Sequence, residues 1–205
     1  GDYDNALMAY QEALALARTL GNMRREAILL TVIGKMRLLQ NADNANNYYD
    51  QAEAIARSLS DDFVLGFVLH HRGFQFINQK PPDYKRGKEL SDEAAKIAAK
   101  LGLPDIHFWS LLNRGSCEHE LGQLTQALAT HYEAYELAKE QNNHFWIAGA
   151  LRSIGEDYHR MDDRVQAQVA FDEALTRWRE VKAKAQADDL IQYMNERAYT
   201  VQPEP

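Results

Sequence analysis

One sequence pattern recurs at a near-constant interval of roughly 40 residues, and it constrains the fold more than any other feature of the chain. The pattern is a small residue, three positions, a bulky residue, two positions and then alanine. It occurs as Ala6-Tyr10-Ala13, Ala45-Tyr49-Ala52, Gly87-Ser91-Ala94, Ala127-His131-Ala134 and Ala167-Phe171-Ala174. A period of this length is typical of a repeat protein, in which each unit contacts only its neighbours.

A second marker keeps the same period. A glycine follows each of the first four closing alanines at a fixed distance, and a leucine stands one helical turn before each glycine. These pairs are Leu30-Gly34, Leu69-Gly73, Leu111-Gly115 and Leu151-Gly155. Glycine destabilises a helix interior, so its recurrence needs a packing reason. Small residues let two helices approach closely. Each unit is therefore predicted to be two antiparallel helices: helix A, which carries the Leu–Gly pair, and helix B, which carries the small–bulky–alanine pattern.

Breaker residues fall between the predicted helices, as at Gly21-Asn22 and Asp162-Asp163. The longest interval, from Ala52 to Ala94, is explained by extra loop residues around Pro81-Pro82. The expected helices span about residues 4–20, 23–40, 44–59, 62–79, 84–101, 105–121, 124–141, 144–160, 164–182 and 185–199.

Composition and charge exclude several classes of function. The chain has a formal net charge of -7, and residues 101–205 carry 10 basic and 17 acidic side chains, which repel phosphates and argue against nucleic-acid binding. The single cysteine, Cys117, rules out an internal disulfide framework and suggests a reducing compartment. No apolar run is long enough for a membrane span. We expect a cytoplasmic protein without membrane association.

The stretches GDYDNALMAYQEALALA and GQLTQALATHYEAYELA resemble helix B of the tetratricopeptide repeat family. The long spacing is similar to that of the repeats in MalT-type bacterial signalling ATPases and transcription regulators. The resemblance implies an all-α fold, a right-handed superhelical solenoid of antiparallel helix pairs. It covers residues 1–200 as one solenoid of about 4.5 to 5 repeats, with 201–205 as a C-terminal tail. Gly1 aligns with the turn residue Gly122, so we expect an unpaired first helix B in a fragment of a larger protein.

Two departures from the family pattern affect packing. Ser91 and His131 stand where the family prefers an aromatic residue, so their B helices are expected to pack less tightly. The last helix A has Ile191 and Asn195 in place of leucine and glycine, as a capping helix would.

In this family the A helices line the concave surface, which implies a binding stripe at fixed offsets from each glycine. In the first unit the stripe reads Ile28, Thr31, Lys35 and Leu38. The predicted ligand- or peptide-binding residues are Phe67, His70, Phe74, Ile77, Asn78, Trp109, Leu112, Ser116, His119, Arg152, Glu156 and His159. Exposed aromatic residues favour an interaction site. The alternative is that these aromatic rings are buried against the next repeat.

No motif for catalysis is present: the chain has no phosphate-binding glycine loop and no nucleophile elbow. The histidines are spread over several repeats without metal-ligand spacing, so no metal or cofactor is expected. We therefore predict a non-catalytic protein- or peptide-binding module, a sensor or partner-docking part of a bacterial regulator. The alternatives are a small-molecule inducer sensor and a structural spacer that self-associates through its uncapped N-terminal helix.

Overall fold

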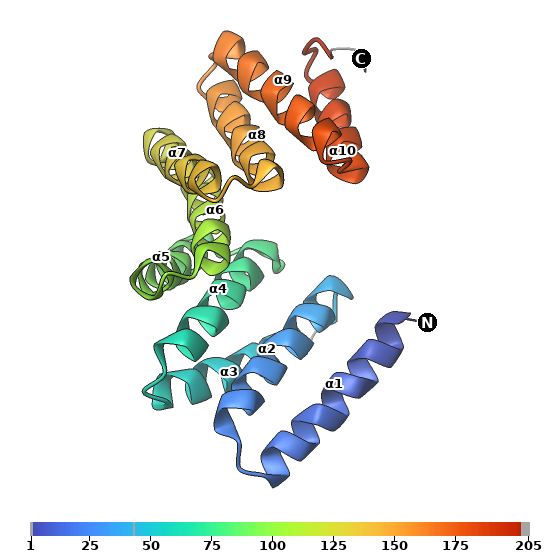
Figure 1. The fold of residues 1–205 in the computed structure, drawn as a ribbon, viewed down its shortest axis with the longest axis vertical. Helices are drawn as coiled ribbons and strands as arrows, with labels where there is room; N and C mark the ends of the chain where they lie inside the picture. Colours follow the sequence, from blue (N-terminus) through green and yellow to red (C-terminus); the bar gives the residue numbers. More distant parts are fainter. Residues whose placement is uncertain (1, 43, 202–205) are drawn as a thin grey trace. The chain divides into compact units, whose positions relative to one another are not determined.

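The chain is built from ten α-helices within the residues that the structure, a computed structural model, describes: 2–42 and 44–201 (Figure 1). The helices are α1 (Asp2–Thr19), α2 (Met23–Leu39), α3 (Ala45–Ser58), α4 (Asp62–Asn78), α5 (Tyr84–Leu101), α6 (Pro104–Glu120), α7 (Leu124–Glu140), α8 (His144–Arg160), α9 (Arg164–Glu180) and α10 (Lys184–Glu196). Even-numbered helices are the predicted A helices and odd-numbered helices the predicted B helices. Successive helices form antiparallel pairs, so the predicted all-α repeat fold is confirmed.

Helix boundaries follow the cap residues in the sequence. Asn22, Asp61 and Asn143 each stand just before an A helix, and each side chain accepts a hydrogen bond from the backbone N–H three positions later. Such N-caps satisfy amide groups that the first turn of a helix leaves without a partner. At the end of α5, Gly102 adopts a φ of 65°, a left-handed conformation that costs glycine little. Gly1, Asp43 and residues 202–205, which carried part of the predicted turns and tail, lie outside the described residues.

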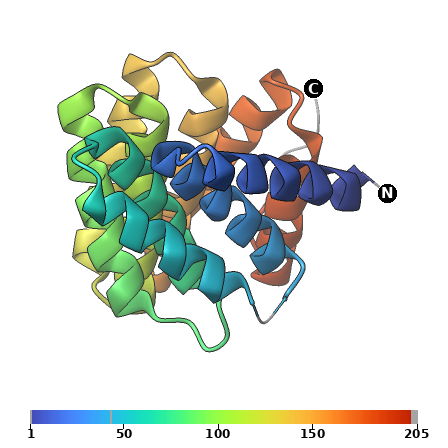
Figure 2. The same cartoon turned by 90° about the horizontal axis from the view of Figure 1, so that it is seen from below.

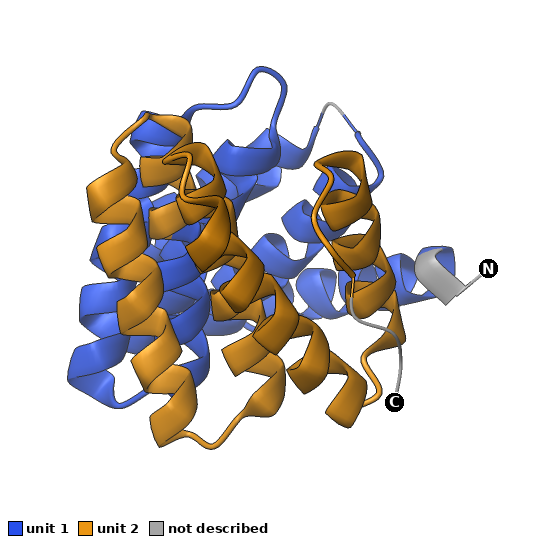
Figure 3. Cartoon of the chain, turned by 90° about the horizontal axis from the view of Figure 1, so that it is seen from above, with its two compact units in different colours: residues 1–113 blue, residues 114–205 orange. Residues whose placement is uncertain are grey.

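The chain divides into two compact units, residues 1–113 and 114–205 (Figure 3). In the first unit, α2 packs against α1, α3 and α4, and α4 packs against α5. Both views show α1 running alongside α2 (Figures 1 and 2). The core of this part contains Leu30 and Ile33 from α2 and Val64 and Val68 from α4.

In the second unit, α8 lies between α7 and α9, and α10 packs on α9. Its fully buried side chains include Ile154 on α8, Phe171 on α9, and Leu190 and Met194 on α10. The prediction of one solenoid over residues 1–200 stays a prediction. No helix formed by residues 2–42 and 44–201 has the length and apolar character that a membrane span requires.

The helix-A glycines pack against the bulky residue of the following helix B, as the two sequence markers predict. A Cβ atom added to Gly34 would lie 3.1 Å from the ring of Tyr49, and one added to Gly155 would overlap the ring of Phe171. The leucine of each marker is buried as well, from Leu30 to Leu151. Glycine is therefore the residue that lets each A–B pair close.

The expected loose packing at Ser91 and His131 is wrong. A Cβ atom on Gly73 would overlap Oγ of Ser91, and one on Gly115 would overlap the imidazole of His131. Both side chains are buried. A small serine is matched by a closer approach of α5 to α4, since the carbonyl oxygen of Gly87 would also lie 3.3 Å from the added Cβ of Gly73.

Candidate functional site

In the first unit, five of the predicted binding residues lie on α4. The helix buries Val68, Leu69 and Gly73 toward its neighbours. The predicted stripe lies on another side of the helix, where Phe67, Phe74 and Ile77 are partly buried. Phe67 also packs against the core cluster of this unit. These side chains are neither fully buried nor fully exposed, so the prediction that they bind a ligand stays a prediction.

Two adjacent histidines give this side of α4 an unusual electrostatic character. Burial, together with the positive charge of Lys35 on α2, lowers the pKa of His70 to about 4. Burial first, and then His70 and Lys35, hold the pKa of His71 well below its ordinary value. Both imidazoles are therefore neutral near pH 7. The ammonium group of Lys35 therefore lies near two neutral imidazole rings, which can form hydrogen bonds.

Helix α6 contacts α4 at His70. Oγ of Ser110 lies 3.3 Å from Nδ1 of His70, which joins α6 to α4. The neighbouring Trp109 is 39% exposed, whereas Phe108 is fully buried and meets it edge-on. Leu112, one turn after Trp109, is partly buried. An exposed indole next to a buried phenylalanine is the type of side chain that anchors a partner.

Asn78 has a different environment from the other predicted residues of α4. Its Nδ2 atom donates a hydrogen bond to the carbonyl oxygen of Phe74, 2.8 Å away. It also lines a polar hollow of about 340 Å³ together with Asn46 and Lys80. This hollow is not lined by His70 or Trp109, so Asn78 stands apart from the aromatic residues.

In the second unit, the predicted residues make hydrogen bonds and ion pairs within the chain. Arg152 donates from Nε to Glu156, 3.0 Å away, and from its terminal nitrogen to Asp189 on α10, 2.5 Å away. Nδ1 of His159 lies 2.8 Å from Oη of Tyr199. Ser116 is partly buried on α6. These bonds tie α8 to the C-terminal segment and hold their side chains in fixed positions.

Asp157 is a buried charge that sequence reasoning missed. Its carboxylate oxygens lie 2.7 Å from Nδ1 of His119 on α6 and 2.6 Å from Nδ1 of His131 on α7. Burial raises the pKa of Asp157, but the hydrogen bonds from the two histidines outweigh it, and the net pKa is lowered. Asp157 thus joins α6, α7 and α8 through one carboxylate. The helical spacing of Asp157 carried no signal for this role, because both partners lie on other helices, far away in sequence.

Within the described ranges, no three His, Cys, Asp or Glu side chains converge closely enough to hold a metal ion. The structure brings Lys35, from the sequence stripe of the first repeat, close enough to His70 to lower its pKa. His71, which falls one position off the stripe, is a neighbour of His70 that the stripe did not include. We call the residues Lys35, Phe67, His70, Phe74 and Trp109 the α4–α6 face.

Comparison with known proteins finds a tetratricopeptide repeat match within the chain. Residues 107–180 match the sequence model of the family described as Tetratricopeptide repeat. A search of curated proteins found no match.

Solved structures with the same fold include a signal transduction ATPase with numerous domains and a tetratricopeptide repeat sensor, from Pyrococcus horikoshii. It is 14% identical with a TM-score of 0.72, and the similarity covers 83% of this chain and 26% of that one. The chain thus spans about a quarter of the ATPase's length. BtubC from P. vanneervenii is 16% identical with a TM-score of 0.71, covering 100% of this chain and 96% of that one.

A Rap protein complexed with Competence and Sporulation Factor is 17% identical with a TM-score of 0.69, covering 90% of this chain and 56% of that one. At these identities the likeness is one of fold. The sequence match over residues 107–180 agrees with the recurrent helix-A glycines and the ten paired helices of the described residues, which have the arrangement of tetratricopeptide repeats.

Proposed function

We propose that the chain is a non-catalytic module that binds a protein segment or peptide on its A helices. Tetratricopeptide repeats bind proteins and peptides, and stacked repeats present extended surfaces for this purpose. The likeness to a repeat sensor of a signalling ATPase and to a Rap protein in complex with its factor supports a sensing or docking role in a larger regulator.

The observation that carries the proposal is the α4–α6 face. Phe67 and Phe74 expose part of their rings, and Trp109 exposes more than a third of its surface. Aromatic side chains of this kind anchor interfaces because they bury a large area with little loss of conformational entropy. Apolar side chains of the bound segment would contact these rings.

Lys35 and His70 are the polar residues of the α4–α6 face, and they determine which polar groups of a ligand it would favour. Because His70 is neutral near pH 7, Lys35 supplies the positive charge on this side of α4. A charge-assisted hydrogen bond to an ammonium group is stronger than a neutral one. We therefore expect the bound segment to carry an acidic side chain or a terminal carboxylate next to its apolar residues.

The predicted residues of the second unit, Ser116, His119, Arg152, Glu156 and His159, are proposed as ligand contacts of that unit by itself. Arg152 already pairs with both Glu156 and Asp189, so it would meet a ligand as part of a fixed cluster of charges. Their positions are set by bonds within the repeat, which reduces the entropy lost on binding.

The experiment is selection of peptides from a random phage-displayed library on the whole chain, followed by calorimetric titration of the enriched peptides. Phe74→Ala and Trp109→Ala should each weaken binding by more than about 1 kcal/mol, the usual threshold for an anchor residue. Lys35→Met should weaken acidic peptides most. Val165→Ala on α9, an exposed apolar residue outside the stripe, is the matched control and should change nothing. If no peptide is enriched, or if the variants bind like the unmodified chain, the proposal is wrong.

A further inference from the structure

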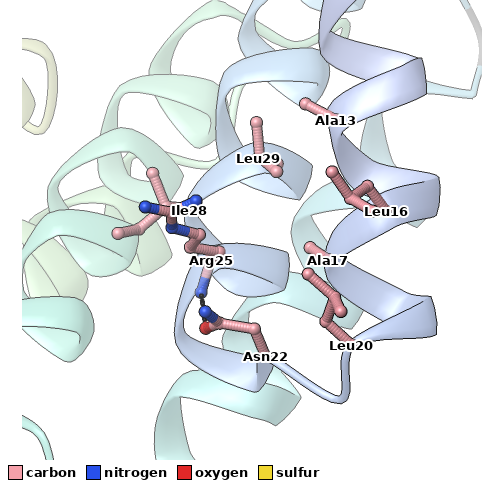
Figure 4. Close-up of a pocket in the computed structure, with 8 residues that line it drawn as sticks. All are labelled: Ala13, Leu16, Ala17, Leu20, Asn22, Arg25, Ile28 and Leu29. Atoms are coloured by element: carbon pink, nitrogen blue, oxygen red, sulfur yellow. Dashed lines mark hydrogen bonds between the residues drawn. The ribbon is translucent and has the colours of Figure 1, made fainter.

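Two hollows of the first unit are similar in size and opposite in chemistry. One, of about 420 Å³, lies between α1 and α2, where Leu16 and Leu20 face Ile28 and Leu29 (Figure 4). The other, of about 340 Å³, lies between the turn that follows α2 and the turn that follows α4. The polar residues of its lining are Asn41, Asn46, Asn78, Gln79 and Lys80. We call this second hollow the amide hollow, because most of these side chains are carboxamides.

The two turns that border the amide hollow are longer than the equivalent turns of the later repeats. Residues 40–44 join α2 to α3 and residues 79–83 join α4 to α5, so that each turn has five residues. The turns at 121–123 and 161–163 have three residues each. Since three residues are enough to connect helix A to helix B, the longer turns need another explanation. Loops held by a rigid scaffold often carry binding groups.

Backbone hydrogen bonds fix both turns against their helices. After α4, the N–H of Gln79 donates to the carbonyl oxygen of Gln75, and the N–H of Asp83 donates to that of Phe76, each over 2.9 Å. After α2, the N–H of Ala42 donates to the carbonyl oxygen of Arg37, also over 2.9 Å. The polar groups of the amide hollow are therefore held in place before a ligand arrives, which lowers the entropy lost on binding.

A buried glutamine sets the orientation of two amide groups in the lining. Gln75 on α4 is fully buried, and its Nε2 atom donates to Oδ1 of Asn46, 2.8 Å away, and to Oε1 of Gln79, 2.5 Å away. Because both oxygens accept from Gln75, Nδ2 of Asn46 and Nε2 of Gln79 are left to donate to another group. Oε1 of Gln75 is buried without a hydrogen-bond partner among the described residues, which costs free energy. A buried amide that is only partly satisfied is explained if it orients these two donors.

Asn78 is oriented the opposite way. Its Nδ2 atom donates to the carbonyl oxygen of Phe74, so its Oδ1 atom is left as an acceptor. Lys80, an exposed residue, adds an ammonium group. The amide hollow therefore offers two amide donors and one positive charge beside an acceptor. The described residues that line it include no acidic side chain.

We propose that the amide hollow binds a small polyhydroxy carboxylate, such as a sugar acid. The carboxylate of the ligand accepts hydrogen bonds from Asn46, Gln79 and Lys80, and the bond from the ammonium group is charge-assisted. A hydroxyl of the ligand donates to Oδ1 of Asn78, and Asn41 can bond a further hydroxyl. The donor is a hydroxyl because a ligand ammonium group would meet the charge of Lys80 with no carboxylate in the lining to balance it.

The size of the amide hollow agrees with a small ligand. Its volume of about 340 Å³ lies at the lower end of the range for small-molecule sites, about 300–1,000 Å³. None of its lining residues belongs to the α4–α6 face. The proposal therefore does not rest on peptide binding there.

The test is an NMR titration of the isotope-labelled whole chain with three probes. Gluconate carries a carboxylate and hydroxyls, glucose carries hydroxyls without a carboxylate, and hexanoate carries a carboxylate without hydroxyls. Gluconate should shift the side-chain amide resonances of Asn46 and Gln79 in a saturable way. It should bind at least about tenfold more tightly than glucose or hexanoate, because each of these lacks one set of hydrogen bonds.

Asn46→Asp is the sharpest variant for this site. It keeps an oxygen that accepts from Gln75 and replaces the amide donor by a charged oxygen, which repels a carboxylate. An acidic residue in the first turn of α3 also favours the helix, so lost binding would not reflect unfolding. Asn46→Asp and Lys80→Met should each weaken gluconate binding at least about tenfold. Lys100→Met, about 24 Å along α5 from the start of that helix, is the matched control and should leave binding unchanged.

Four outcomes would overturn the proposal. Gluconate gives no saturable shift at millimolar concentrations, or glucose or hexanoate binds as tightly as gluconate. The third is that Asn46→Asp binds gluconate like the unmodified chain. The fourth is that Trp109→Ala, which tests the α4–α6 face, abolishes gluconate binding, since this would place the ligand on that face instead.

Discussion

Replacing Gly155 by alanine should destabilise the second unit, although alanine is the better helix former. Gly155 lies inside α8, and a Cβ atom there would overlap the ring of Phe171 on α9. That ring is fully buried, so it has no free space into which to move. Gly149 on the same helix is the matched control, because a Cβ atom there would meet nothing within 4 Å.

Gly149→Ala and Gly155→Ala raise the helix propensity of α8 by the same amount, but only Gly155→Ala places a new atom against another side chain. Alanine in place of glycine inside a helix gains about 1 kcal/mol. Forcing an extra carbon into a close-packed core costs about 1–3 kcal/mol, and the rigid ring places Gly155→Ala at the upper end. We therefore expect Gly149→Ala to stabilise by about 1 kcal/mol and Gly155→Ala to destabilise by about 2 kcal/mol.

Urea unfolding followed by circular dichroism measures both changes. A double-mutant cycle with Phe171→Leu should show a coupling on the order of 1 kcal/mol, since the smaller side chain relieves the overlap. The reasoning is refuted if both glycine substitutions stabilise the chain equally. It is also refuted if Phe171→Leu and Gly155→Ala are additive.

Three further predictions concern charged and titrating groups. Asp157→Ala should cost about 2–4 kcal/mol in urea unfolding, because it leaves the Nδ1 donors of His119 and His131 without their acceptor. Acid should destabilise the first unit between pH 6.5 and about 4. The unfolded chain binds a proton at His70 near pH 6.5 and the folded chain only near pH 4, so stability falls as pH falls, by about 1–3 kcal/mol. His70→Gln should remove that part of the pH dependence. Arg72→Ala should lower the free energy of unfolding by more than about 2 kcal/mol, because the buried guanidinium of Arg72 stacks on Phe76 and pairs with Asp50 and Glu53. Arg57→Ala is the comparison: its salt bridge is more exposed, and its loss should cost under about 1 kcal/mol.

The helices and their pairing could be predicted because their signals are local. Asn22 and Asp61 mark helix starts by their own cap chemistry, and Gly34 and Gly155 mark close contacts by their lack of a side chain. The observed helix boundaries lie within about three residues of those expected. The pairing of the helices could be predicted from the regular spacing of the two sequence markers, because the same contact between a glycine and a bulky residue recurs in each repeat.

The roles of polar residues inside the helices were harder to predict. His119 donates to a buried carboxylate on a helix far away in sequence, a contact that its place in the predicted stripe does not indicate. Ser91 was expected to loosen its repeat, yet the neighbouring helix approaches closely enough to fill the space. Both outcomes depend on the distance between two helix backbones, which the pattern of one helix does not encode.

The central functional claim is that a ligand binds the α4–α6 face, and the fluorescence of Trp109 tests it most directly. Of the three tryptophans, Trp109 is 39% exposed, whereas Trp146 and Trp178 are buried. Acrylamide quenching should therefore report mainly on Trp109, and a Trp109→Phe variant supplies the control. We predict that a peptide selected on the chain protects Trp109 from acrylamide with the same affinity that calorimetry measures. Saturating binding that leaves the quenching unchanged would contradict the account.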